Sequence, residues 1–248
     1  RSSLLPGLVA AVLHNTKRQQ ARVRLYETGL RFLPGDAGLQ QVPTLAMVIT
    51  GARYSEGWAG QSGSADFYDL KGDLESLLAL TRAPGSFSFS AGTRDALHPG
   101  QTALVRRDGT AVGYIGALHP TTARELGLQA PLFACELALE ALLQAELPAF
   151  AELSKFPEVR RDLAVVVDKS VPAADLMSNV EEAAGTYLTD LTLFDVYEGK
   201  GIDPKRKSVA LGLTFRDQSR TLSDEDVNLA VNQVIDSLEK NYKAELRN

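Results

Sequence analysis

The chain has 248 residues, of which 44% are hydrophobic and 23% are charged, and its formal net charge is −5 at pH 7. This is the composition of a globular protein with room for one large domain or two smaller ones. Residues 1–150 carry 13 basic and 13 acidic side chains, whereas residues 151–248 carry 13 and 18. This distribution of charge argues against a protein that binds nucleic acid mainly by neutralising phosphates. Any contact with nucleic acid is therefore expected to be local and to depend on geometry.

Membrane insertion and disulfide bonding are also disfavoured. The longest purely apolar run, Leu8–Leu13, is too short to cross a bilayer, and no signal peptide is visible. The single cysteine, Cys135, cannot form an intrachain disulfide and lies in an apolar, strand-like run, which predicts a core residue in a cytoplasmic protein. The chain starts at Arg1 without a methionine, and we expect it to be the C-terminal part of a longer protein.

Residues 1–150 predict a mixed domain. Helical periodicity covers Leu4–Arg18 and Asp66–Arg82. Strand-like patterns cover Arg22–Phe32, Pro43–Gly51, Ser86–Ala91, Gln101–Arg107, Ala111–Leu118 and Leu132–Leu139. Many strands interrupted by few helices indicate an antiparallel sheet in an α+β domain.

A domain boundary is predicted between Leu147 and Pro157, where two prolines flank a segment with little periodicity. A second domain, residues 154–248, follows it. Its predicted strands are Leu163–Asp168, Leu188–Glu198, Lys207–Arg216 and Lys243–Arg247, and its helices begin near Ser170–Pro172 and at Ser223, where Asp226 completes a capping box. The order β-α-β-β-α-β is ferredoxin-like.

That order places both helices on one face of the sheet and leaves the other face open. The large apolar side chains of the third strand need the covered face, so its small residues fall on the open one: Ser208, Ala210, Gly212 and Thr214. Small residues there are expected to leave the sheet accessible to a flat ligand. On the last strand, Ala244 and Leu246 are expected to point inward and Arg247 outward.

The stretch Leu193–Ile202 carries the strongest indication of function. Asp195 and Tyr197 are two residues apart, so on a strand both side chains point to the same face. The ring can stack on a nucleobase, the carboxylate can accept hydrogen bonds from it, and nearby cations can hold phosphate: Lys200, Lys205, Arg206 and Lys207. Two plainer alternatives remain open, an edge-strand tyrosine without a ligand and a solvated basic turn.

Nine segments, in this order and spacing, strongly resemble the C-terminal portion of the bacterial phenylalanyl-tRNA synthetase beta subunit family. They are Arg1–Leu8, Leu25–Gly29, Phe67–Asp73, Leu97–Gly100, Gly113–Pro120, Ser154–Pro157, Arg160–Val167, Phe194–Gly201 and Arg220–Glu225. The resemblance covers essentially the whole chain. No single motif is decisive, but the co-linear set is highly specific.

The resemblance implies a class II synthetase-like domain over residues 1–150 that is not catalytic, followed by a ferredoxin-fold anticodon-binding domain. It also implies a subunit of a cytoplasmic phenylalanine–tRNA ligase, an α2β2 heterotetramer in which the alpha subunit carries the ATP- and magnesium-dependent chemistry and phenylalanine tRNA is the RNA partner. The strand Leu132–Leu139 has neither the glycine nor the arginine that a class II active site needs there. We therefore expect no cofactor and no metal in this chain, and no membrane partner.

By the same resemblance, the open sheet face reads the first anticodon base. Tyr197 would stack on it, Asp195 would accept from guanine N1–H and N2–H₂, and Ala164 would leave room for it. Ser208 and Arg247 would supply polar and phosphate contacts. Five further cations are candidates for the RNA backbone: Arg160, Lys200, Lys205, Arg206 and Lys207. For Arg160 and Arg161, ion pairs with Glu158 and Asp162 are an equal alternative.

Other polar groups are expected to be structural. Asp66, Asp69 and Asp73 compensate the helix N-terminus rather than bind metal. His98 and His119 each precede a proline and mark turns. No P-loop, CxxC pair, nucleophile elbow or HExxH motif is found, which argues against an independent hydrolase or transferase. The alternative function is a stand-alone ferredoxin-like regulatory or small-ligand-binding module, which predicts no affinity for RNA.

Overall fold

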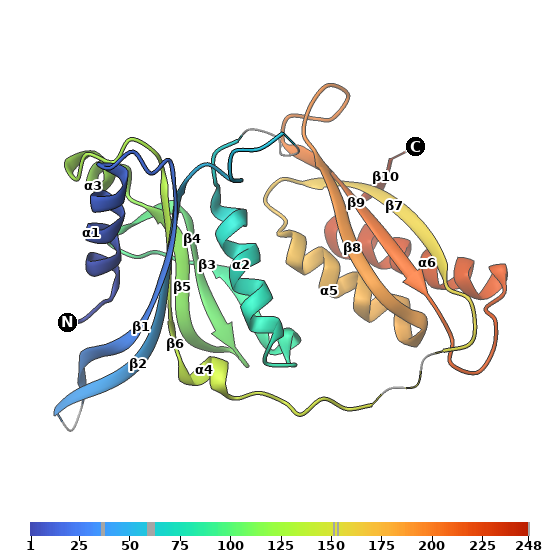
Figure 1. The fold of residues 1–248 in the computed structure, drawn as a ribbon. Helices are drawn as coiled ribbons and strands as arrows, with labels where there is room; N and C mark the ends of the chain where they lie inside the picture. Colours follow the sequence, from blue (N-terminus) through green and yellow to red (C-terminus); the bar gives the residue numbers. More distant parts are fainter. Residues whose placement is uncertain (36–37, 59–62, 151, 153, 248) are drawn as a thin grey trace. The chain divides into compact units, whose positions relative to one another are not determined.

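The computed structural model of the chain describes residues 1–248 except 36–37, 59–62, 151, 153 and 248. The chain folds as two compact units, unit 1 from Arg1 to Ala149 and unit 2 from Phe150 to Asn248 (Figure 1). Among the described residues, no helix is long and apolar enough to cross a membrane. Each unit has its own sheet, and each is described by itself.

Unit 1 is built on a six-stranded antiparallel sheet with the order β1-β2-β6-β5-β4-β3. The strands are β1 (Arg22–Gly35), β2 (Gly38–Gly51), β3 (Phe87–Ala91), β4 (Leu97–Arg107), β5 (Thr110–Leu118) and β6 (Leu132–Ala138). The helices are α1 (Leu5–Thr16), α2 (Phe67–Ala79), α3 (Pro120–Glu125) and α4 (Glu140–Leu143), with a 3-10 turn at Pro84–Ser86. The short helices α3 and α4 were not predicted, and β1 and β2 are longer than predicted.

Helices cover both faces of this sheet, α1 and α3 on one side and α2 on the other (Figure 1). Alternate side chains of β6 enter the two cores, Leu132 and Ala134 on the α1 side, Phe133 and Cys135 on the α2 side. Burial raises the pKa of the Cys135 thiol to about 12, as fits a core residue rather than a nucleophile.

One charged side chain lies inside the α1-side core. Glu136 of β6 is only 1% exposed, yet its carboxylate accepts hydrogen bonds from the Tyr114 hydroxyl group at 2.7 Å, the Leu4 amide at 2.5 Å and the Ser3 hydroxyl group at 2.9 Å. Arg31 adds an ion pair at 3.5 Å. These donors offset the cost of burying the charge, and they fix the start of α1 to the sheet.

Two of the three carboxylates at α2 serve the helix N-terminus as expected, and the third has a different partner. Asp66 and Asp69 form a capping box at the helix start, and Arg53 bridges both, at 2.5 and 3.0 Å. Asp73 pairs with Arg24 at 2.5 Å. In the described part of the chain, no group of three or more His, Cys, Asp or Glu side chains is arranged to hold a metal ion.

Unit 2 has the predicted ferredoxin-like order. It consists of β7 (Val159–Asp168), α5 (Ala173–Ala184), a 3-10 turn (Gly185–Tyr187), β8 (Leu188–Tyr197), β9 (Arg206–Phe215), α6 (Asp224–Tyr242) and β10 (Glu245–Leu246). The strands form an antiparallel sheet with the order β10-β7-β9-β8, and both helices lie on one face of it (Figure 1). The α+β fold class is thus confirmed.

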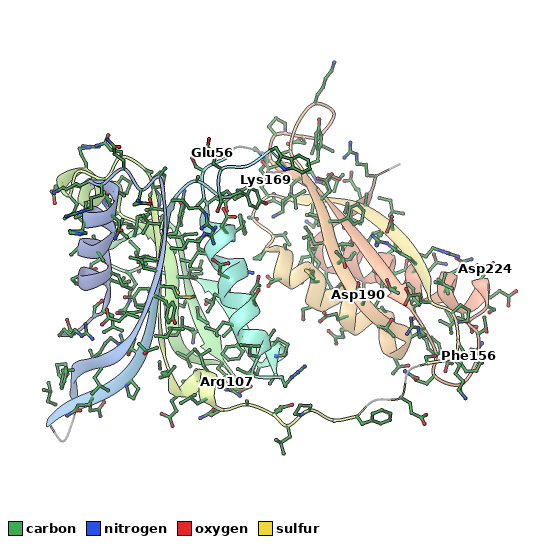
Figure 2. The ribbon with its side chains drawn as sticks, in the orientation of Figure 1. Glu56, Arg107, Phe156, Lys169, Asp190 and Asp224 are labelled. Carbon is green, nitrogen blue, oxygen red and sulfur yellow. The ribbon has the colours of Figure 1, made fainter. Side chains whose placement is uncertain are left out.

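The core of unit 2 lies between the helices and the inward side chains of the sheet, which include Leu163, Val165, Leu211, Leu213 and Phe215. The predicted capping box of Ser223 and Asp226 is present at the start of α6, beside Asp224 (Figure 2). The last strand is shorter than predicted, only two residues long, because Lys243 adopts a left-handed conformation that ends α6. Leu246 pairs with the core residue Val165 and so lies on the helix-covered face as predicted, although it is 45% exposed at this edge of the sheet.

Candidate nucleic-acid interface

A β-bulge in β8 decides where Asp195 and Tyr197 point. Leu193 pairs with Leu211 of β9, but the next paired residue of β8 is Asp195, opposite Ala210, so Phe194 is an extra residue. Leu191 and Leu193 face the core, and strict alternation would send Asp195 there as well. The bulge reverses the alternation and brings Asp195 and Tyr197 to the face that α5 and α6 leave uncovered within unit 2, here called the open face.

The strand register then assembles two rows of side chains across the open face. In one row Asp195 lies opposite Ala210, which lies opposite Ala164 of β7. The Ala164 carbonyl group accepts the Arg247 amide at 2.9 Å, which adds Arg247 to the same row. In the next row Tyr197, Ser208 and Val166 lie side by side. The structure therefore brings Ala164, Asp195, Tyr197, Ser208 and Arg247 into one patch.

Within this patch, Tyr197 already has a cationic neighbour. The guanidinium carbon of Arg247 lies 5.0 Å from the centre of the Tyr197 ring, within the range of a cation–π contact. The Tyr197 hydroxyl group donates to the Lys200 carbonyl group at 3.3 Å, which holds the ring toward the β8–β9 turn. Arg247 thus occupies one side of the ring that is predicted to stack on a base.

The small residues of β9 do not leave the open face bare, and this part of the prediction was wrong. Ser208 is only 4% exposed, so it lies in the floor of the face rather than projecting from it. Gly212 is covered by Arg160, because a Cβ atom built there would lie 2.6 Å from Nη2 of Arg160. Ala210 and Thr214 are half-buried.

The basic candidates separate into two groups. Three are held by partners in unit 2: Arg160 by Asp162 at 2.9 Å, Arg206 by Glu245 at 2.5 Å, and Lys207 by the Lys169 and Val171 carbonyl groups at 3.2 and 2.7 Å. Arg206 also donates to the Val166 and Lys243 carbonyl groups at 2.5 and 3.0 Å, so it ties β10 to β7.

Lys200 and Lys205 are exposed in the β8–β9 turn, and the structure records no ion pair for either side chain among the described residues. Asp168 faces this turn at the end of β7. Hydrogen bonds from the Ser170 hydroxyl group and amide, together with the nearby charges of Arg206 and Lys205, lower its pKa. The alternative ion pairing holds for Arg160, while Arg161 pairs with Asp224 and Glu158 pairs with Arg216.

Comparison with protein families identifies the chain. Residues 1–139 match the family described as phenylalanyl tRNA synthetase beta chain CLM domain, and residues 154–247 match the ferredoxin-fold anticodon binding domain. The first match alone spans more than half of the chain. The chain belongs to the phenylalanyl-tRNA synthetase beta chain family. The resemblance to the beta subunit found in the sequence is thus confirmed.

Relatives agree with this assignment. The chain is 52% identical over 247 residues to the phenylalanine–tRNA ligase beta subunit of Pseudomonas putida (strain KT2440), and 46% identical over 250 residues to that of Haemophilus influenzae (strain Rd). Each comparison covers 100% of this chain but 31% of the relative. This beta-chain region therefore spans about a third of the length of these curated relatives, both of which are named as subunits of a ligase.

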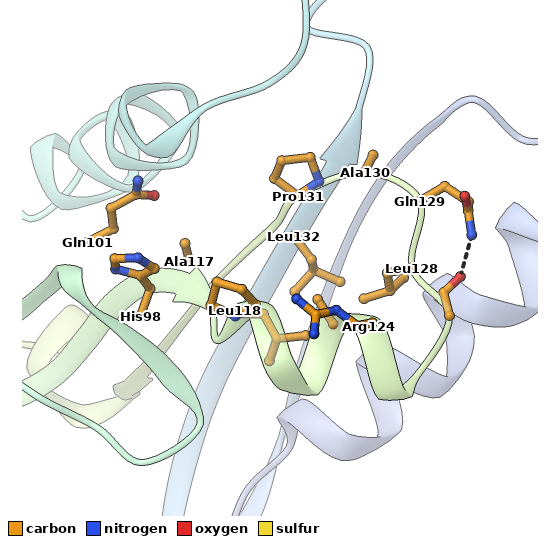
Figure 3. A pocket seen from close by; sticks show the side chains of 13 residues that line it. His98, Gln101, Ala117, Leu118, Arg124, Leu128, Gln129, Ala130, Pro131 and Leu132 are labelled. Carbon is orange, nitrogen blue, oxygen red and sulfur yellow. Dashed lines mark hydrogen bonds between the residues drawn. The ribbon is translucent and has the colours of Figure 1, made fainter.

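Unit 1 of the beta-chain region contains a hollow beside α3 of about 620 Å³ (Figure 3). Its lining is mostly apolar, with His98, Gln101, Arg124 and Gln129 as the larger polar side chains. His98 accepts the Gly100 amide at Nδ1, and His119 accepts the Thr121 amide. Both histidines have structural roles, but His98 lies within β4 and His119 caps α3, so neither marks the turn that was predicted. The hollow brings together no nucleophile with a base.

Two features of the candidate interface escaped the sequence prediction. Phe194 belongs to a segment that carries the family resemblance, but the sequence does not predict that it is a surface residue, and it is 50% exposed. The sequence predicts open space at Gly212, whereas Arg160 covers this position. A strand of alternating residues shows neither feature, because a bulge and a cross-strand contact depend on the pairing partner.

Proposed function

We propose that unit 2 of this beta-chain region recognises the anticodon of phenylalanine tRNA on its open face. One observation carries the proposal. The β8 bulge places a carboxylate and an aromatic ring together on a sheet face without helices, beside the small residues Ala164 and Ala210. A net charge of −5 leaves little general attraction for RNA, so recognition rests on this local geometry.

Each residue of the patch has a proposed role toward the first anticodon base. Tyr197 stacks on the base, and Asp195 accepts hydrogen bonds from N1–H and N2–H₂ of guanine, which its two acceptor oxygens suit. Ala164 leaves room for the base, and Ser208 offers its hydroxyl group from the floor. Since the Arg247 guanidinium group lies over the Tyr197 ring, binding exchanges a cation–π contact for a base stack and frees Arg247 to bind phosphate.

The exposed cations of the β8–β9 turn serve the RNA backbone in this proposal. Lys200 and Lys205 project from the turn next to Tyr197 and carry most of the phosphate contact. Arg206 and Lys207 contribute less, because they are held by carbonyl groups and by Glu245.

We further propose that the whole protein works as part of a cytoplasmic phenylalanine–tRNA ligase, with an alpha subunit in an α2β2 heterotetramer that attaches phenylalanine to its tRNA at the expense of ATP. In this proposal the alpha subunit binds ATP and Mg²⁺. Two observations support it: strand β6 has no arginine and no glycine, and the described residues offer no cluster of three or more metal ligands.

The β1–β2 hairpin is the proposed contact surface for the alpha subunit. It runs beyond the part of β2 that pairs with β6, and β1 forms an edge of the sheet. Exposed apolar side chains lie along it, among them Tyr26, which is 74% exposed, Leu30 and Leu39. A long edge strand with exposed apolar residues is suited to a partner protein.

The test of the anticodon proposal is a titration of the chain with anticodon stem-loops that carry guanine, inosine or adenine as the first anticodon base. Inosine lacks the N2 amino group, and adenine also lacks the N1–H donor. We expect affinity in the order guanine, inosine, adenine, and Asp195→Asn should remove most of the difference, about 1–3 kcal/mol between guanine and adenine. Asp190→Asn, an exposed acid on the same strand (Figure 2), is the matched control.

Equal affinity of the unmodified chain for all three stem-loops would contradict the proposal. No affinity for any of them, together with an oligomer that forms when a small ligand is added, would favour a stand-alone regulatory module instead.

A further inference from the structure

Phe194 is an exposed aromatic residue that has no role in the proposed recognition of the first anticodon base. It is the extra residue of the β8 bulge and is 50% exposed. It is not among the described residues that form the core of unit 2 or pack against it. Packing in the core therefore does not explain why this ring is exposed on the sheet face that is proposed to bind RNA.

Arg160 of β7 reaches across the open face toward this ring. Its guanidinium carbon lies 5.7 Å from the centre of the Phe194 ring, and its Nε donates to Asp162 at 2.9 Å. The path runs over Gly212, where a Cβ atom would lie 2.6 Å from Nη2 and 3.0 Å from the guanidinium carbon. Three features thus hold Arg160 beside Phe194: the Asp162 acceptor, the space at Gly212 and the ring itself.

An aromatic ring next to a guanidinium group is the arrangement with which proteins stack unpaired bases, because both groups present a π face or a planar cation to the base. Tyr197 with Arg247 is one such pair, and Phe194 with Arg160 is a second on the same face. Three positions separate the two rings along β8, on the order of 7–10 Å, since the bulge shortens the strand locally. Two neighbouring bases of a splayed single strand fit that separation.

We propose that Phe194 and Arg160 form a second stacking site, which takes the nucleotide next to the one on Tyr197. Phe194 supplies the stacking surface, and Arg160 covers the base edge or binds its phosphate. Gly212 is a positioning residue, because its missing side chain lets Arg160 lie across the sheet. This inference rests on the proposed anticodon recognition, and it extends the interface from one base to two.

The experiment uses the full chain and two anticodon stem-loops, each with one 2-aminopurine, at the first anticodon base or at the adjoining base. Stacking on a ring quenches the fluorescence of this analogue, so each probe reports one site. In the unmodified chain both probes should be quenched on binding. Phe194→Leu keeps an apolar side chain in the bulge but removes the ring. It should abolish quenching at the adjoining base, preserve it at the first base, and weaken binding about 5- to 20-fold.

Gly212→Ala is the second variant, and it decides the matter if Phe194→Leu fails to fold. The three atoms nearest to the added methyl group all belong to the movable end of Arg160, so the fold should tolerate the change while Arg160 is displaced. Because Arg160 no longer lies beside Phe194, binding should weaken about 3- to 10-fold. Leu229→Ala removes an exposed apolar side chain of α6, outside the sheet face, and should change neither probe.

The outcomes separate the two claims. If Tyr197→Ala weakens binding and releases the first-base probe while Phe194→Leu and Gly212→Ala bind as tightly as the unmodified chain, the second site is refuted and anticodon recognition stands. If neither Tyr197→Ala nor Phe194→Leu alters binding, both proposals are refuted together.

Discussion

The sheets of the two units differ in how many of their faces carry helices. Unit 1 covers both faces of its six-stranded sheet, and even its buried carboxylate, Glu136, is surrounded by donors. Unit 2 covers one face of a four-stranded sheet and keeps charged and aromatic side chains on the other. Polar groups on a covered face need hydrogen-bond partners within the same unit. Polar groups on an open face can instead have their partners on another molecule.

The largest expected effect comes from the buried charge of unit 1. Glu136→Ala leaves the Tyr114 hydroxyl group and the Leu4 amide without their acceptor inside the core. We expect unit 1 to lose about 3 kcal/mol of stability, measured by hydrogen exchange of the β5 and β6 amides. Glu140→Ala, at the exposed start of α4, is the control and should cost little. An equal effect of both changes would mean that the Glu136 cluster is not what holds α1 on the sheet.

Two glycines provide a matched test of covered against open faces. At Gly113 of β5 a Cβ atom would lie 2.3 Å from the Glu136 carbonyl oxygen and 2.8 Å from the Leu137 Cα atom, both of which are backbone atoms. At Gly212 of β9 the three nearest atoms all belong to the flexible Arg160 side chain. Gly113→Ala should therefore destabilise unit 1 by about 1–3 kcal/mol, whereas Gly212→Ala should change the stability of unit 2 by no more than about 0.5 kcal/mol.

Hydrogen exchange reports the stability of both units in the same sample. The loss of stability that each glycine variant causes in its own unit can therefore be compared directly. Comparable losses of stability in the two units would show that the open face of unit 2 is as tightly packed as the covered faces of unit 1.

In unit 2, a smaller effect on stability is expected when the pH is lowered. Bonds from Arg220 and then from the Ser223 hydroxyl group and amide lower the pKa of Asp226 below its ordinary value of 3.8. Because the folded-state pKa is the lower one, the stabilisation is complete above about pH 4 and is lost as the pH falls below that value. Amide protection in the first turn of α6 should fall on acidification, and less steeply in Asp226→Asn.

The control for this pH effect is Asp236→Asn, which changes an exposed acid farther along α6. It should retain the pH dependence of amide protection seen in the unmodified chain. A weaker pH dependence in this variant would mean that the effect depends on the total charge of α6 and not on Asp226 in particular.

Much of the fold follows from local patterns. The alternation in β9, the stripe of α6 and the capping box at Ser223 and Asp226 each depend on residues that are close in the sequence. The helices α3 and α4 escaped prediction because six and four residues are too few to display a helical period.

The candidate site was less predictable, because its geometry depends on pairing between strands. That Asp195 and Tyr197 share a face follows from their spacing, but which face they share depends on the Phe194 bulge. In the same way, Arg206 and Lys207 look like free cations in the sequence, while the fold brings carbonyl groups of distant residues to both. The roles assigned to the site residues remain predictions.

The most direct test of the central claim is a titration of the chain with the phenylalanine tRNA anticodon stem-loop, comparing Tyr197→Ala with Tyr26→Ala. Both changes remove a tyrosine ring from a strand, one on the open face of unit 2 and one on the exposed edge of unit 1. Loss of a stacked base predicts that Tyr197→Ala raises the dissociation constant about 5- to 150-fold while Tyr26→Ala leaves it unchanged. Equal dissociation constants for the two variants would contradict the assignment of the open face as the RNA interface.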